Sequence, residues 1–365
     1  MSILDKKLAD TPVRKSRRVR IIIASIALIL LIGLLVFTNI GSDAALVVHF
    51  FTPPSHFTYS GHTNYVSGVA WSPDGPDGKR IASASGDGTV QVWNAQTGSK
   101  IYTYRGHSGD VLCLAWSPDG KYIASGGLDT TVQVWDASDG HHIYTYHGHA
   151  DAIFSVAWSP DETRIASASN DGTVQVWDAT SGTHVLTVSG AATKGAPAPW
   201  NAVAWSPDGK RIAIGGNGPA QVLDATTGQS IAYYGYHGGI VHVAAWSPDG
   251  AYLAIGDSDF TVQVWNVATV RNVYTYSGHT SDVLAVAWSP DGPDGKRIAS
   301  GSSDGTVQVW DALTGGHVYV YRGHADFALG HFTGGSAVNS VAWAPDGKSI
   351  ASGGNDATVQ VWPVE

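Results

Sequence analysis

The sequence predicts an all-β fold, a seven-bladed β-propeller, preceded by one transmembrane α-helix. A unit of roughly 40–45 residues recurs seven times from residue 57 onward, the period typical of four-stranded propeller blades. Each copy contains short runs rich in Val, Ile, Tyr and Trp that are separated by turn residues, as expected of strands. Ahead of the copies, residues 21–40 are apolar and uncharged and long enough to cross a bilayer.

The amino terminus differs in charge from the rest of the chain. Residues 1–20 hold seven Lys and Arg against two Asp, whereas residues 41–365 hold fourteen basic and twenty-eight acidic residues, a net charge of −14. A basic flank directly before an apolar segment favours an N-terminus inside the cell. We therefore expect a basic cytoplasmic tail (1–20), a signal-anchor helix in the cytoplasmic membrane (21–40), a linker (41–55) and an extracytoplasmic propeller (56–365).

A cleaved signal peptide is the main alternative to a retained anchor. Ser42-Asp43-Ala44 has the small-x-small form of a cleavage site. The apolar core of a signal peptide is about 7–15 residues long, and the segment here is longer and follows a twenty-residue head. A retained anchor is therefore the preferred interpretation.

Two short sequence motifs, called words below, mark each copy. The word AWSPD, or AWAPD in the last copy, places tryptophans at Trp71, Trp116, Trp158, Trp205, Trp246, Trp288 and Trp343. The word VQVW places Trp93, Trp135, Trp177, Trp265, Trp310 and Trp362, with Leu223 in the fourth copy. In the second copy VLCLAW, KYIASGG, TVQVW and HIYTY give four strands, and Pro, Asp and Gly mark the turns between them.

These words resemble those of the WD-repeat family. Gly-His pairs precede five copies, at Gly61-His62, Gly106-His107, Gly148-His149, Gly278-His279 and Gly323-His324. Trp-Asp ends the second word at Trp135-Asp136, Trp177-Asp178 and Trp310-Asp311. The resemblance covers about residues 57–365 and implies a seven-bladed propeller. The nearly identical, SPDG-rich copies look like bacterial members of that family.

The ends of the repeat region predict how the ring closes. The chain stops after the third strand of the seventh copy, and HFTYSGH (56–62) stands before the first copy without partners. It is similar to the fourth-strand sequences HIYTYHGH and NVYTYSGH. We expect residues 56–61 to supply the missing fourth strand and leave no open sheet edge.

Histidine, serine and aspartate recur with tryptophan at fixed offsets in five copies. A catalytic triad is not normally built five times on one ring, and the resemblance implies structural tetrads, in which His bridges Asp and Ser and Ser meets the indole N–H. The tetrads are His62, Ser83, Asp87, Trp93; His107, Ser125, Asp129, Trp135; His149, Ser167, Asp171, Trp177; His279, Ser300, Asp304, Trp310; and His324, Ser352, Asp356, Trp362.

Candidate binding residues come from the loops between a fourth strand and the next first strand, which the family's geometry assigns to the top face. Two of these loops are long, at 191–200 and 325–337. Their large side chains could contact a partner or fold back over the domain. The candidates on these loops and at the start of first strands are Trp200, Phe327, His331, Phe332, Tyr65, Asp110, Phe154, His242 and Asp282.

The sequence contains no motif of a known catalytic class, no cofactor motif and no convincing metal site. A net charge of −14 on residues 41–365 argues against a nucleic-acid binder. We expect a non-catalytic scaffold that binds a protein or peptide through its top face. The alternatives are a propeller enzyme with its active site in the central funnel, for which His242, Asp110 and Asp282 are the only hints, and a self-assembling or adhesive surface head.

Overall fold

The computed structural model describes residues 57–73, 80–190, 199–235, 239–290, 296–324 and 336–364. The tail, helix and linker expected over residues 1–55 lie outside the described residues. Within the described residues, no helix has the length and apolar character needed to cross a membrane.

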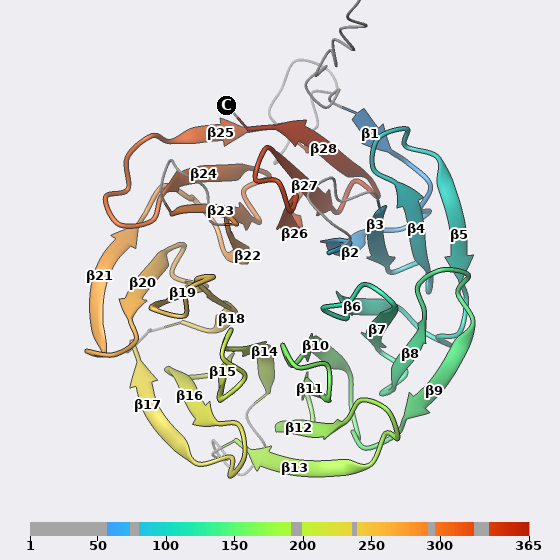
Figure 1. Cartoon of the computed structure of the whole chain (residues 1–365). Coiled ribbons are helices and arrows are strands. Elements are labelled where there is room, and N and C mark those ends of the chain that lie inside the picture. The colour runs from blue at the N-terminus through green and yellow to red at the C-terminus, as the bar shows by residue number, and fades with distance from the viewer. Residues whose placement is uncertain are drawn as a thin grey trace, which may run out of the picture. The chain divides into compact units, whose positions relative to one another are not determined.

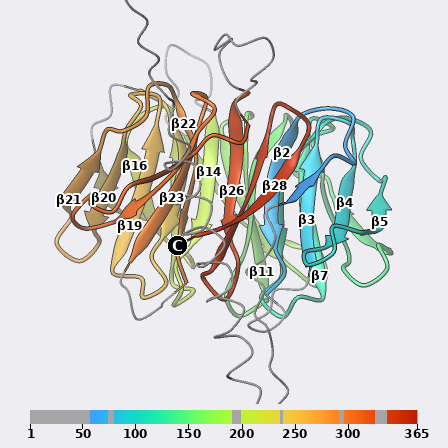
Figure 2. The ribbon, with the colours of Figure 1, turned by 90° about the horizontal axis from the view of Figure 1, so that it is seen from above.

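Seven four-stranded antiparallel sheets form the repeat region. Figure 1 shows them as blades around a central opening, and Figure 2 shows the strands running between two opposite faces. The all-β, seven-bladed prediction is confirmed. We call the face with the loops between second and third strands and between successive blades the top face. The face with the SPDG turns is the bottom face.

Within each blade, the strands are numbered in chain order from the innermost strand, at the central opening, to the outermost. The strands of the first four blades are β2 (Val66–Trp71), β3 (Arg80–Ser85), β4 (Val90–Asn94), β5 (Lys100–Tyr104); β6 (Val111–Trp116), β7 (Tyr122–Gly127), β8 (Val132–Asp136), β9 (His142–Tyr146); β10 (Ile153–Trp158), β11 (Arg164–Ser169), β12 (Thr173–Asp178), β13 (His184–Ser189); and β14 (Trp200–Trp205), β15 (Arg211–Gly216), β16 (Ala220–Asp224), β17 (Ser230–Tyr234).

The remaining blades follow the same order. Their strands are β18 (Val241–Trp246), β19 (Tyr252–Asp257), β20 (Val262–Asn266), β21 (Arg271–Tyr276); β22 (Val283–Trp288), β23 (Arg297–Ser302), β24 (Val307–Asp311), β25 (Tyr319–Tyr321); and β26 (Val338–Trp343), β27 (Ser349–Gly354), β28 (Val359–Pro363) with β1 (Phe57–Tyr59).

The seventh blade takes its outer strand from the opposite end of the chain. β1 pairs antiparallel with β28, with Phe57 opposite Val361 and Tyr59 opposite Val359. Tyr59 then stacks on Trp93 of the first blade, with ring centroids 5.0 Å apart. One short strand therefore joins the last blade to the first.

The tryptophan of each AWSPD word joins its blade to the preceding blade. Its indole Nε1–H donates to the carbonyl oxygen of the alanine that precedes the equivalent tryptophan, over 3.0–3.2 Å. The pairs are Trp71–Ala342, Trp116–Ala70, Trp158–Ala115, Trp205–Ala157, Trp246–Ala204, Trp288–Ala245 and Trp343–Ala287. All seven interfaces share this bond, so the word that repeats most faithfully also closes the ring.

The fourth blade replaces polar and aromatic repeat positions with aliphatic side chains. Ile214 stands at the tetrad serine position and Leu223 at the VQVW tryptophan position, and both are buried in one apolar cluster. Val188 of the preceding blade packs on this cluster. The fourth blade thus depends on apolar packing where five others use a hydrogen-bonded tetrad.

Candidate functional site

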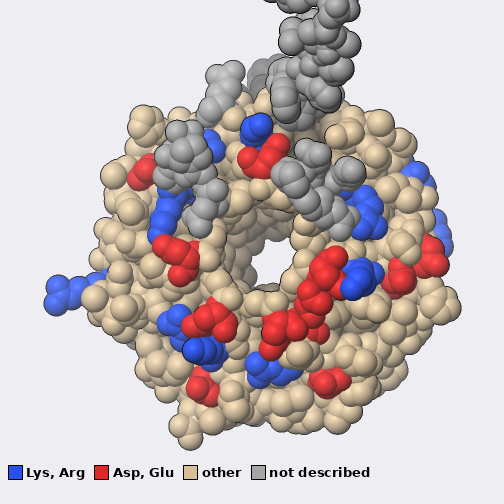
Figure 3. Space-filling view, in the orientation of Figure 1, with Lys and Arg blue, Asp and Glu red and all other residues tan. Residues whose placement is uncertain are grey.

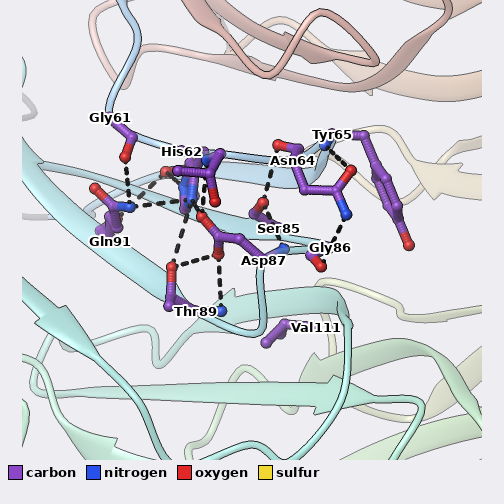
Figure 4. Close-up of polar contacts among 12 residues, drawn as sticks. Gly61, His62, Asn64, Tyr65, Ser85, Gly86, Asp87, Thr89, Gln91 and Val111 are labelled. Carbon is purple, nitrogen blue, oxygen red and sulfur yellow. Dashed lines mark hydrogen bonds and ion pairs between the residues drawn. The ribbon is translucent and has the colours of Figure 1, made fainter.

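The five predicted sets of His, Ser and Asp are brought together on the top side of their blades. In each, histidine Nδ1 lies 2.8–2.9 Å from an aspartate Oδ2, and Nε2 lies 2.8–2.9 Å from a serine Oγ. Figure 4 shows the first set, in which His62 lies between Asp87 and the strand that carries Gln91. The aspartate sits in the tight turn between second and third strands, and the same carboxylate accepts the N–H of Thr63.

The geometry fixes the protons of the tetrad. A carboxylate only accepts, so histidine Nδ1 carries a hydrogen, and in the neutral imidazole Nε2 then accepts from the serine hydroxyl. Serine Oγ in turn accepts the indole N–H of Trp135, Trp310 and Trp362 over 3.3–3.4 Å. The indole nitrogens of Trp93 and Trp177 are buried without a hydrogen-bond partner. Every histidine nitrogen is therefore committed to structure, and the tetrads offer no free base.

Burial and hydrogen bonding hold the tetrads in one protonation state. Burial lowers the pKa of His62 and His149, although each faces an aspartate that opposes this effect. Burial also raises the pKa of Asp171, but hydrogen bonds from Thr173, Ala150 and His149 outweigh it, so the net pKa is lowered. In the tetrads of His62 and His149 the result is a neutral imidazole against an ionised carboxylate at neutral pH.

We expect stability to fall as the pH falls. His62 and His149 have lowered pKa values in the folded state, so the unfolded chain takes up their protons first, near pH 6.5. The tetrad aspartates, with pKa values below the usual 3.9, add a second loss below about pH 4. Urea midpoints should therefore decrease from pH 8 to 6 to 4.

The net charge of the protein predicts the opposite change of stability with pH. The molecule is acidic, so protonation reduces its self-repulsion and by itself would stabilise the folded state. A urea midpoint that rises between pH 8 and 6 would show that net charge, not the buried histidines, governs the pH response.

A tyrosine–glutamine contact accompanies each tetrad and was not predicted from the sequence. The last tyrosine of a fourth strand stacks on the VQVW tryptophan of the next blade, and its hydroxyl donates to the glutamine of the same word. The pairs are Tyr59–Gln91, Tyr104–Gln133, Tyr146–Gln175, Tyr276–Gln308 and Tyr321–Gln360. A Cβ on the Gly-His glycine would collide with this tyrosine, which explains the glycine.

A β-bulge interrupts the innermost strand of every blade at its second residue. Pairing with the second strand skips one position in each copy, so one residue is left outside the pairing. The seven bulge residues are Ser67, Leu112, Phe154, Asn201, His242, Leu284 and Asn339. They mix polar, aliphatic and aromatic side chains, whereas the two residues that end the same strand are Ala-Trp in all seven copies.

Five of the bulge residues meet around one cavity at the top of the central opening. The cavity measures about 490 Å³, and Phe154, Asn201, His242, Leu284 and Asn339 line it from five successive blades. Phe154 is 36% exposed, and none of the seven bulge side chains is buried. Among the described residues, no Lys, Arg, Asp or Glu lines the cavity, so its described lining suits an uncharged ligand surface.

The polar bulge residues have a second role. Ser67, Asn201 and Asn339 each donate to the carbonyl oxygen of the first residue of a neighbouring innermost strand: Val111, Val241 and Val66, respectively. The apolar bulge residues Leu112, Phe154 and Leu284 make no such hydrogen bond and present an apolar side chain instead. Hydrogen bonds from Asn201 and Asn339 therefore join neighbouring blades at the cavity. Phe154 and Leu284 leave apolar surface there for contact.

The remaining predicted contact residues form two separate pairs. The Tyr65 hydroxyl donates to Asp110 over 2.8 Å, which joins the first two blades. His242 Nε2 lies 3.7 Å from Asp282 Oδ2, beyond hydrogen-bond distance, and is buried without a hydrogen-bond partner. Burial lowers the pKa of His242, and Asp282 and Asp257 oppose this effect. The structure therefore joins no two of His242, Asp110 and Asp282 by a hydrogen bond of catalytic geometry.

Trp200 is not a surface contact, so its assignment as a binding residue was wrong. It is the first residue of β14, only 5% exposed, at the position that valine or isoleucine fills in the other six copies. Side chains at that position point into the interface between blades, so the tryptophan packs in the core. Phe327, His331 and Phe332 lie outside the described residues.

Metal ligation finds no support among the residues that the structure describes. Within 57–73, 80–190, 199–235, 239–290, 296–324 and 336–364, no three His, Cys, Asp or Glu side chains are grouped as a metal site would require. His149, the histidine of the third tetrad, is occupied by Asp171 and Ser167.

The repeated blades form a closed ring, and the buried His–Ser–Asp tetrads are structural. These two features define the class of the protein as a repeat propeller. The chain belongs to the WD40 family, described as WD domain, G-beta repeat, whose model matches residues 54–94, 98–136, 140–178, 228–266, 270–311 and 316–363. Three strands of the fourth blade, β14 to β16, fall in the unmatched stretch 179–227, whereas β17 lies within the match to 228–266.

Curated relatives match one part of the chain. WD repeat-containing protein 1 of Gallus gallus is 38% identical over 82 residues, and its counterpart from Bos taurus is 37% identical over 82 residues. Ribosome assembly protein 4 of Chaetomium thermophilum is 35% identical over 63 residues. These matches cover 17–21% of this chain and only 12–13% of the relatives' own length.

Proposed function

We propose that this protein is a non-catalytic scaffold that binds a protein or peptide partner at the top of its central opening. The observation that carries the proposal is the ring of seven β-bulges. Each copy repeats the same frame, and the residue at the bulge position, half-buried or exposed, differs in type among the copies. Five of these positions line one cavity of about 490 Å³.

The chemistry of the cavity favours a neutral peptide surface. Phe154, Ile240 and Leu284 supply apolar contact, and Ile240 is 39% exposed. Asparagine side chains offer both a donor and an acceptor, as a peptide main chain requires. His242 adds a neutral ring whose Nε2 has no hydrogen-bond partner within the described residues. Membership of a family of repeat propellers is consistent with such a role.

We also propose that residues 21–40 anchor the protein in the cytoplasmic membrane with the propeller outside the cytoplasm. Two features of the sequence support this placement: twenty residues without a charge and a +5 segment directly before them. Protease treatment of intact cells should digest the propeller and spare the tail. Digestion of neither part, or release of the chain by alkaline washing of membranes, contradicts the placement.

The binding proposal is tested by capture with the full-length chain. Phe154→Ala and Leu284→Ala together remove apolar surface from the cavity, and Ile101→Ala is the matched control because Ile101 is 47% exposed on the outer strand β5. A partner retained by the native chain and the control should be retained at least tenfold less by the double variant. Equal retention by all three forms excludes this cavity as the binding site.

A further inference from the structure

The bottom face carries a series of clefts between neighbouring blades. In each, the first residue of a second strand faces the AWSPD tryptophan of the next blade. Four clefts hold an arginine whose guanidinium carbon lies 4.7–4.9 Å from the indole centroid: Arg80 on Trp116, Arg164 on Trp205, Arg211 on Trp246 and Arg297 on Trp343. Arg80 and Arg164 also donate to backbone carbonyls, of Ala137 and Ala225, respectively. The repeated architecture of these clefts therefore accommodates a cation.

Two clefts hold tyrosine in place of arginine. Tyr122 stacks on Trp158 with centroids 6.3 Å apart, and Tyr252 stacks on Trp288 at 6.2 Å. In the second of these, Lys296 Nζ lies 4.5 Å from the centroid of Tyr252 and pairs with Asp249. The cation that arginine supplies elsewhere is thus supplied here by a lysine of the following blade.

In the cleft between the second and third blades, no Lys or Arg among the described residues lies over the tyrosine ring. Thr163 stands at the position of Lys296, and its hydroxyl donates to Asp161. A cavity of about 230 Å³ remains, several times the volume of one water molecule. Its walls include Asp119, Tyr122, Ile143, Tyr144, Trp158 and Glu162. Aromatic rings and carboxylates together form the type of site that binds organic cations.

The charges around this cavity are only partly compensated. Glu162 replaces the glycine of the SPDG turn at a backbone φ of +64°. Its carboxylate has no hydrogen bond or ion pair within the described residues, and it interacts electrostatically with Lys121. Asp119 pairs with Lys121 at 2.8 Å, but the lysine side chain is 71% exposed, so this pair is weak and exchangeable. Figure 3, which looks onto the bottom face, shows acidic side chains gathered beside the central opening over the blades of β6 and β10.

We propose that this cleft binds a cationic group, a primary ammonium or a guanidinium, in the place that Lys296 fills in its twin. The cation lies over Tyr122 between Asp119 and Glu162, and its aliphatic stem packs on Ile143. The source is either a Lys or Arg side chain of a protein or a free amine. This site lies on the face opposite the top cavity and does not depend on the proposed function.

Calorimetric titration of the full-length chain tests the site with three compounds: n-butylammonium, the peptide acetyl-Gly-Lys-Gly-amide and its neutral norleucine analogue. The two cations should bind and the norleucine peptide should not. Thr163→Lys places the chain's own ammonium over Tyr122 and should weaken binding of both cations at least tenfold. Lys296→Thr should open the twin cleft and raise the stoichiometry from one to two.

Glu162→Gly serves where Thr163→Lys fails to fold. Other copies carry glycine at this turn position, including Gly120 and Gly250, and glycine favours the positive φ, so folding is preserved. Cation affinity should fall several-fold. Unchanged affinity in both variants, or equal binding of the norleucine peptide, overturns the proposal. Equal affinity for butylammonium and the lysine peptide supports a free amine as the source, and at least tenfold tighter binding of the peptide supports a protein.

Discussion

Removal of the closing strand is expected to destabilise the whole ring. A chain that begins at residue 61 lacks β1, whereas a chain that begins at residue 56 retains it. Without β1, β28 loses its outer partner and Trp93 loses the rings of Phe57 and Tyr59, which lie 5.4 and 5.0 Å from it. Loss of buried aromatic packing alone costs about 3–5 kcal/mol.

Denaturant midpoints of the two truncated chains measure this effect. Because they differ only by residues 56–60, any difference belongs to the strand and not to the amino-terminal segment. The shorter chain should also associate with increasing concentration, since the free edge of β28 can pair with other chains. Equal midpoints would mean that the seven interfaces hold the ring without the closing strand.

The second large effect is expected from the aspartate of a tetrad. Asp304 accepts hydrogen bonds from His279 Nδ1, from the N–H of Thr280 and from both the N–H and the hydroxyl of Thr306. Asp304→Ala leaves the buried imidazole N–H without an acceptor and opens the turn. The expected loss in the free energy of unfolding is about 2–4 kcal/mol, because one unsatisfied buried donor already costs about 1–3 kcal/mol.

Asp259 is the matched control for this substitution. It occupies the same turn position in the fifth blade, where Ile255 replaces the tetrad serine, and it is exposed. Asp259→Ala should change the free energy of unfolding by less than about 0.5 kcal/mol, as surface substitutions usually do. If urea denaturation gives the two variants equal losses, the turn itself and not the tetrad is the source of stability.

The sequence predicted the fold because the copies are nearly identical. Recurrence of AWSPD and VQVW defines blade number, strand order and turn positions. Which contacts join the blades was not predictable from recurrence, because a repeated residue can serve its own blade or a neighbour. The indole groups of the AWSPD tryptophans all bond across an interface, which their recurrence alone does not reveal. The glutamine of VQVW repeats as faithfully, and its link to a neighbouring tyrosine emerged only from the structure.

The candidate site was predicted in part. Phe154 and His242 were chosen from their place early in a first strand, and both line the top cavity. Asn201 and Asn339 were missed, although aligning the seven first strands would have shown the same variable position. Trp200 was misassigned because it was counted as the last residue of the loop 191–200, whereas it begins β14 and immediately precedes the bulge residue Asn201. Pattern alone does not reveal a bulge, which depends on pairing with the second strand.

The bulges also bear on how such a molecule can change over evolutionary time. An apolar bulge residue, outside the strand pairing and not buried, contributes little to folding, so its replacement is nearly neutral for stability, whereas the Ser and Asn bulge residues also hydrogen-bond to a neighbouring blade. Duplication of a blade would copy the tryptophan, tyrosine and tetrad contacts intact and leave one position free to drift. The apolar members Leu112, Phe154 and Leu284 make no side-chain hydrogen bonds that their replacement would break. The residues proposed for recognition therefore differ from those that stabilise the fold, and selection can change the former without destabilising the latter.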